Sequence, residues 1–561
     1  MLSIRLALLA AAAILVASPD AHAQFWATGA KAQNQVEQGP LPARQADDQS
    51  DSQQNQPSTP GADLPESDVP VSSTPAQDRP MPRATRPAGP AASLGGSGAT
   101  GPDSVGLLPA RDTNFDRNTW RGSNFATVLR LMSALPDRID SAGQHELARN
   151  LLVSIADAPS GDDGSTRLLE LRVRKLLSMG NVADAAALAR AANDLQRNPA
   201  LAQVEIEAEL LAGQVESACI DLRATANILT DAASAAALNL CLQSAGQGID
   251  GAGVDTGSLG AASIIAGIPP SADPVSSPPA RLVAAAINPR VPPEQRVDAG
   301  FAAGRASALT GEFLAKLMQG STGGNVPSGP PTDGASAAAL YHAIGQEGPV
   351  DQRIGMAEHG LLSPEGVADK VGVAMVAPLR NFQAVAELAT VAPRMAILFY
   401  TIGDTEAAAP WAELADTTGN GALLWPYRML LKQADANGIG DWQQKAGLDA
   451  PHFSRVLTIL SAFDLVRPPN PNAEIAGDDR AEPPFPDLLA MDKAAAGRRS
   501  GEAVLYALAL LGRGGPAQAH PLALRRVLAD LDQVSLHSEA RLLAFEAITA
   551  TLFEGARGAG P

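Results

Sequence analysis

The residue types that most often carry enzyme chemistry are present in this chain, but their spacing matches no catalytic motif. His145 and Glu146 begin a His-Glu-x-x-His zinc motif, yet Arg149 stands where the second histidine should be. The chain contains no Gly-x-Ser-x-Gly nucleophile elbow and no Walker phosphate loop. Its seven histidines are scattered, whereas metal sites need clusters. We therefore expect no catalytic, cofactor-binding or metal-binding residues. Because 60 residues are acidic, a catalytic carboxylate pair stays open as the alternative.

The two cysteines, Cys219 and Cys241, offer a covalent cross-link. They lie at similar distances before and after a turn near Thr230, so antiparallel neighbouring helices would bring them side by side. In an exported chain an even pair is more often a disulfide than two free thiols. We predict this disulfide, and by the chain-entropy estimate it would contribute roughly 3 kcal/mol. The alternative is that both are small buried residues in a tight contact between helices.

Four aromatic residues are concentrated in one stretch of the chain: Trp411, Trp425, Tyr427 and Trp442. Two interpretations are open. The side chains either fill the core between helices or form the wall of a binding groove, since Trp and Tyr anchor many interfaces.

Composition excludes nucleic acid as a partner. The formal net charge is −18, which repels phosphate backbones at long range. No polybasic run occurs, and aromatic residues make up only 4% of the chain, which leaves few side chains for stacking on bases.

The elements that would position these residues are amphipathic helices. Leu147, Leu151, Leu152 and Ile155 share one helical face, and comparable apolar stripes recur along the chain without convincing period-2 strands. Glycines that end such helical runs recur every 33 residues, at Gly180, Gly213 and Gly246. The pattern predicts an all-α fold of stacked antiparallel helical hairpins, an α-solenoid-like architecture with these glycines at the turns.

Two of these segments resemble tetratricopeptide-type repeats over about residues 140–245. The family has a glycine at the end of its first helix, an apolar residue two positions later and an alanine five positions later. The matching residues are Gly180, Val182 and Ala185 in one segment and Gly213, Val215 and Ala218 in the next. The resemblance implies a helical-repeat scaffold, and the remainder of the chain shares only generic helices with the family.

The first 23 residues resemble a secretory signal peptide. Arg5 supplies a positive start, residues 6–17 are almost wholly apolar, and Ala21-His22-Ala23 fits the cleavage rule. No cysteine lies near the cleavage site, so a lipoprotein is not expected. We predict a periplasmic or secreted protein whose mature chain has no transmembrane helix.

The chain after the signal peptide divides by composition. Residues 24–110 are rich in Pro, Gln, Ser and Gly and predict a disordered tether, either a plain spacer or a scaffold for a partner's Pro-binding groove. The remaining divisions are a helical-repeat unit (111–246), Gly- and Pro-rich loops with one helical stretch (247–334), a second helical unit (335–466), a linker (467–486) and C-terminal helices (487–561).

These features favour a scaffold without catalytic activity that binds a protein or peptide partner in the cell envelope. The alternative is an enzyme, or its accessory subunit, that acts on the cell wall. A deep pocket containing a buried carboxylate with a raised pKa would indicate the enzyme, and a broad groove without one would indicate the scaffold.

Overall fold

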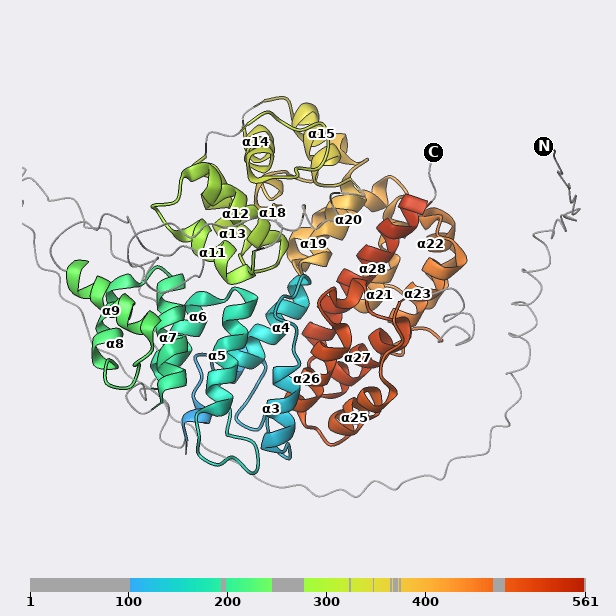
Figure 1. Cartoon of the computed structure of the whole chain (residues 1–561). Coiled ribbons are helices and arrows are strands. Elements are labelled where there is room, and N and C mark those ends of the chain that lie inside the picture. Colours follow the sequence, from blue (N-terminus) through green and yellow to red (C-terminus); the bar gives the residue numbers. More distant parts are fainter. Residues whose placement is uncertain are drawn as a thin grey trace, which may run out of the picture. The chain divides into compact units, whose positions relative to one another are not determined.

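Helices form the regular structure of this protein (Figure 1). The computed structural model describes residues 101–192, 198–244, 277–321, 324–346, 348–363, 366, 372, 375–467 and 480–558. Within these residues no strand occurs, and two isolated bridges join Leu108 to Ser154 and Asn124 to Ser160. The prediction of an all-α fold is confirmed. The signal peptide and nearly all of the predicted tether lie outside the described residues.

The helices up to residue 244 follow one another closely along the chain. They are α2 (Ala110–Thr113), α3 (Phe125–Ser133), α4 (Ala142–Val153), α5 (Arg167–Met179), α6 (Val182–Ala191), α7 (Pro199–Leu211), α8 (Val215–Ala224) and α9 (Ala232–Ser244). Side-chain caps fix several starts: Asn124 accepts from the N–H of Ala126 in α3, and Ser141 accepts from the N–H of Gln144 in α4.

Shorter helices occupy the middle of the chain: α11 (Pro279–Ile287), α12 (Pro293–Arg305), α13 (Gly311–Gln319), α14 (Gly334–Gly345), α15 (Val350–Gly360) and α18 (Val376–Leu379). The later helices are α19 (Ala392–Thr401), α20 (Thr405–Thr417), α21 (Trp425–Leu430), α22 (Ile439–Ala446), α23 (Ala450–Ser461), α25 (Phe485–Ala496), α26 (Ser500–Leu511), α27 (Pro521–Gln533) and α28 (His537–Gly558). Single turns of 3₁₀ helix are η2 (Pro102–Ser104), η3 (Ala386–Leu388), η4 (Gly421–Leu424), η5 (Ala436–Gly438) and η6 (Gly515–Ala517).

Consecutive helices pack on one another, but packing also joins distant parts of the chain. Helix α5 contacts α6 and α7, and α7 contacts α8, as expected for repeated hairpins. In addition, α3 and α4 contact α26, and α4 contacts α28. One hydrophobic cluster extends from Phe115 to Phe553, so the helical units predicted from composition share a core.

The tether was predicted to run to residue 110, but the structure packs its last ten residues against the helices. Asp103 and Ser104 are buried, and the Asp103 carboxylate accepts a 2.8 Å hydrogen bond from the N–H of Leu169 in the first turn of α5. Gly106 approaches the backbone so closely that a Cβ there would lie 2.4 Å from the Ser154 carbonyl oxygen. Glycine is needed for this contact, whereas composition alone suggests flexibility.

The region predicted as loops with one helical stretch, 247–334, contains three helices in its described part. Pro279 opens α11, where its missing N–H costs nothing, so a Pro-rich stretch that resembles a loop is a helix start. The single helical stretch expected within this region is instead divided between α12 and α13. Ser307, with a positive φ of 57°, lies at the break between the two helices. Among all described residues, no helix combines the length and apolarity needed to cross a membrane.

Candidate functional site

Two of the three predicted turn glycines are described, and both end a helix in the left-handed conformation. Gly180 has φ +92° and Gly213 has φ +76°. At the first turn the N–H of Asn181 donates to the Leu176 carbonyl, and at the second the N–H of Gln214 donates to the Glu209 carbonyl, each at 2.8 Å. These are Schellman-type ends, which explains the glycine at each position. Gly246 lies outside the described residues.

The first of these turns borders a cleft of about 720 Å³. Helix α4, the α5–α6 turn, α11 and the segment between α12 and α13 form its walls, together with Val376 and Ile402. Apolar side chains, among them Val283, Ile287 and Phe313, cover much of it. Its volume lies within the roughly 300–1,000 Å³ typical of ligand pockets. The cleft combines four separate stretches of sequence, so no local motif could reveal it.

One edge of the cleft is polar. The Arg149 Nε donates to Asp184 Oδ2 at 2.6 Å, which fixes both side chains at the rim. His145 Nε2 lies 3.2 Å from the Met179 carbonyl oxygen, and since a carbonyl only accepts, this nitrogen carries the proton. Burial lowers the pKa of His145 to about 4, so it is neutral at pH 7. Asn181 also belongs to the lining, but its Nδ2 is buried and has no hydrogen-bond partner among the described residues.

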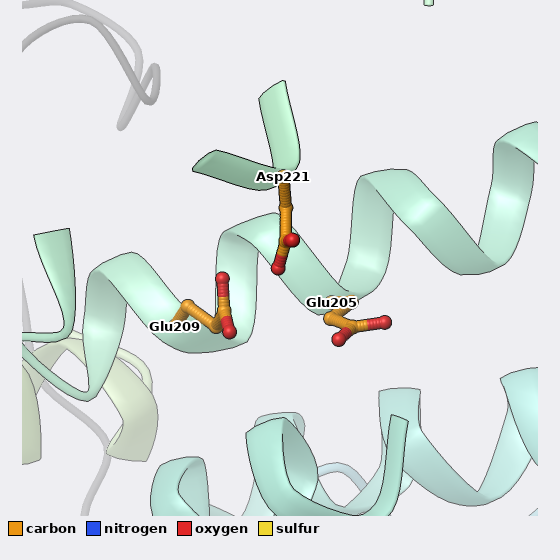
Figure 2. A group of neighbouring side chains, drawn as sticks. All are labelled: Glu205, Glu209 and Asp221. Atoms are coloured by element: carbon orange, nitrogen blue, oxygen red, sulfur yellow. The ribbon is translucent and has the colours of Figure 1, made fainter. Parts of the chain in front are cut away.

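The second hairpin carries a different group of polar residues. Glu205 and Glu209 on α7 and Asp221 on α8 each offer a carboxylate oxygen within 4.8 Å of the other two (Figure 2). Glu205 and Glu209 are fully buried, and Asp221 is partly exposed. Arg190 of α6 forms an ion pair with Glu209. These carboxylates could hold a metal ion, because three oxygen ligands meet in one place.

Burial and repulsion between neighbouring carboxylates make Glu205 and Asp221 hard to ionise. Burial raises the pKa of Glu205 to about 8, and the charges of Asp221 and Glu209 add to this, while Arg190 opposes it. Burial and the neighbouring Glu209 raise the pKa of Asp221 to about 6. Neither residue belongs to the lining of the 720 Å³ cleft. The cleft and the most perturbed carboxylate therefore lie at different places in the fold.

The four aromatic residues are buried in this structure. Trp411, Trp425, Tyr427 and Trp442 are between 0% and 4% exposed. The rings of Trp425 and Trp442 pack with centroids 5.3 Å apart, and the Tyr427 hydroxyl lies 2.8 Å from Thr549 Oγ1 in the core. Of the two interpretations left open by the sequence, these contacts support core filling.

The two cysteines lie at disulfide distance, as the spacing predicted. Cys219 of α8 and Cys241 of α9 have Cα atoms 5.5 Å apart and are joined through their sulfur atoms. The second hairpin is thus linked covalently to the helix that follows it.

Sequence reasoning missed the residues of the cleft and the carboxylate group. One signal for the carboxylates was available, because the 33-residue spacing of Gly180 and Gly213 places Glu205 at the position that Arg172 occupies in the first hairpin. A charged residue at an apolar position of a helix is a sign of a special environment. Comparisons of this chain with protein-family models, with curated proteins and with solved structures find no match.

Proposed function

We propose that this protein is an exported helical-repeat scaffold that binds a peptide segment of a partner in the cell envelope. The observation that carries this proposal is the cleft beside Gly180, where an apolar wall that includes Val283 and Ile287 is combined with the polar edge formed by Arg149 and Asp184. Binding sites commonly combine these two features, because apolar contact supplies affinity and a few polar groups fix orientation.

The lining indicates what kind of segment would fit. An apolar side chain would contact Val283, Ile287 and Phe313 in the cleft lining. The net charge of −18 and the Glu146 carboxylate in the lining favour a segment with basic side chains. The proposed partner class is therefore a basic, partly apolar peptide.

The alternative of a cell-wall enzyme requires a carboxylate with a raised pKa inside the pocket. Glu205 has the raised pKa but does not line the cleft, and this separation is why we put forward binding in place of hydrolysis.

The test uses peptides selected from a random display library with the purified protein. Their dissociation constants are then measured by fluorescence anisotropy for the wild type, Ala183→Arg and Ala224→Arg. Both alanines are exposed on helices, but only Ala183 lines the cleft, so the second variant is a control with the same charge change. We expect Ala183→Arg to weaken binding at least about tenfold, which corresponds to roughly 1.4 kcal/mol, and Ala224→Arg to bind like the wild type. Failure to select any peptide, or equal binding by all three proteins, would reject the proposal.

A further inference from the structure

Glu205 is a fully buried acidic side chain for which the described residues supply no hydrogen bond. Its exposed fraction is 0%, and both carboxylate oxygens lack a partner. Buried polar groups are nearly always hydrogen-bonded, so an unpaired carboxylate in a folded protein calls for an explanation such as an ion. One of its oxygens belongs to the group in which Glu209 and Asp221 also take part.

The charges around Glu205 do not balance. The three carboxylates would carry three negative charges when ionised, and Arg190 is the one cationic side chain that acts on both Glu205 and Asp221 in the described part of the chain. Its Nη2 already contacts Glu209 and donates to Gln214 Oε1 at 2.7 Å. Glu209 Oε2 stays without a partner. Two negative charges are left over, which is the charge that one divalent cation neutralises.

The ligand atoms identify the class of cation. An all-oxygen set suits the hard ions Ca²⁺, Mg²⁺ and Mn²⁺ and disfavours ions that prefer sulfur or imidazole. Two oxygens bound to one Ca²⁺ at roughly 2.3–2.6 Å can be up to about 5 Å apart, whereas Mg²⁺ at roughly 2.0–2.1 Å limits them to about 4 Å. The carboxylate oxygens lie within 4.8 Å of one another, a range that Ca²⁺ can span throughout and Mg²⁺ only in its shorter part.

We propose that Glu205, Glu209 and Asp221 bind one Ca²⁺ ion between helices α7 and α8. Asp221 is partly exposed and gives the ion a route from solvent, while the two glutamates hold it from the buried side. The ion ties α7 to α8 close to the disulfide, because Cys219 lies two residues before Asp221 on the same helix. This site is separate from the cleft and does not depend on peptide binding.

The experiment is a calorimetric titration of the chelator-treated, full-length protein with CaCl₂ alone, repeated with MgCl₂ alone. We expect one Ca²⁺ per chain in the wild type and at least about tenfold weaker binding in Glu205→Gln and in Asp221→Asn. Glu216→Gln removes an exposed carboxylate of α8 outside the group, so this control should bind Ca²⁺ like the wild type. Ca²⁺ should also raise the midpoint of thermal unfolding of the wild type and of Glu216→Gln, and leave that of Glu205→Gln unchanged.

If Glu205→Gln does not fold, Asp221→Asn provides the same test from the partly exposed side of the group. Absence of saturable Ca²⁺ binding in the folded wild type would overturn the site, and a proton shared among the carboxyl groups would then take its place. Equal Ca²⁺ affinity in wild type, Glu205→Gln and Asp221→Asn would also overturn it. Tighter binding of Mg²⁺ than of Ca²⁺ would overturn the assignment of the ion.

Discussion

Arg172 in the α5–α6 hairpin and Glu205 in the α7–α8 hairpin occupy equivalent positions, each eight residues before the glycine that ends its helix. Both side chains are buried, but they carry opposite charges and differ in their partners. Arg172 donates to four backbone carbonyls, those of Leu152 (2.8 Å), Asp103 (3.3 Å), Val105 (2.6 Å) and Ser154 (2.9 Å). Glu205 has no hydrogen-bond partner among the described residues.

The difference shows how one repeat position can tolerate either charge. The backbone of residues 103–105 and the end of α4 surround Arg172, so the protein itself satisfies the guanidinium. None of the described residues donates a hydrogen bond to Glu205. Its buried carboxylate must therefore either be neutralised by a proton or be paired with an added ion. The hairpins share a turn, and their surroundings decide what each buried position requires.

The largest effect should come from removing the buried guanidinium. Arg172→Met leaves several buried carbonyls without donors, and we expect it to lower the free energy of unfolding by about 3–5 kcal/mol. Without divalent cations, Glu205→Met at the equivalent position should be neutral or stabilise by about 1 kcal/mol. Urea denaturation followed by circular dichroism measures both. Arg174→Met, on the same helix but about half exposed, is the control and should change stability by less than about 0.5 kcal/mol. Similar losses in Arg172→Met and Glu205→Met would remove the contrast between the hairpins.

Only the second hairpin is linked covalently to the next helix, so reduction should act on it selectively. Replacing Cys219 and Cys241 together by serine should lower stability by roughly 3 kcal/mol and increase amide hydrogen exchange in α8 and α9. Exchange in α5 and α6 should change little. A thiol count of two on the denatured, unreduced protein would show that the bond does not form.

A fall and a rise in pH should weaken the protein through different helices, α4 and α7. Burial lowers the pKa of His145 from 6.5 to about 4, so its contribution to stability is present above pH 6.5 and is lost as the pH falls towards 4. Burial raises the pKa of Glu205 from 4.5 to about 8, so its contribution is present below pH 4.5 and is lost as the pH rises towards 8. At about 1.4 kcal/mol per pKa unit, the full shifts correspond to about 3 kcal/mol for His145 and about 5 kcal/mol for Glu205.

The pH measurement compares unfolding free energies between wild type and single variants in the presence of a chelator. His145→Gln should remove the loss on the acid side, and Glu205→Gln should reduce the loss between pH 4.5 and about 8, to which Asp221 with its raised pKa also contributes. A variant whose pH profile is parallel to that of the wild type would show that its residue does not titrate as described.

The smallest difference concerns the two turn glycines. A Cβ on Gly180 would lie 2.7 Å from the Ala308 Cβ, whereas a Cβ on Gly213 would meet nothing within 4 Å. Both have positive φ, so Gly213→Ala should cost about 1 kcal/mol from the backbone alone. Gly180→Ala should cost about 1 kcal/mol more because of the clash. Thermal unfolding of the two variants measures this difference, and equal midpoints would indicate that the contact with Ala308 relaxes freely.

Local features of this fold could be predicted from sequence, and features that depend on distant segments could not. The glycine turns at Gly180 and Gly213 and the Cys219–Cys241 pair follow from short-range geometry, because a helix end and a turn constrain them directly. The packing of Gly106 against Ser154 depends on a contact between separate segments, which composition does not record.

The candidate sites illustrate the same limit. The cleft requires α4, α6, α11 and α13 to come together. That Asn181 Nδ2 is buried without a hydrogen-bond partner is known only once its surroundings are known. The sequence could not show whether the aromatic residues fill the core or line a groove. A tryptophan suits either place, and only its burial in the structure distinguishes the two. In the sequence Glu205 is one of many acidic residues. Only the spacing of the turn glycines identifies it as the equivalent of Arg172 in the other hairpin.

The packing of α4 against α28 has a consequence for the order of events after synthesis. The Glu546 carboxylate of α28 accepts a 2.7 Å hydrogen bond from the N–H of Gly143 at the start of α4, across 403 residues of chain, and it also contacts the Ser141 hydroxyl. Contacts over such separations close slowly, and this one cannot form before the last helix has left the ribosome. Helix α4 therefore stays incompletely covered until α28 has been synthesised. Helix α28 is therefore the element that completes the packing around the start of α4.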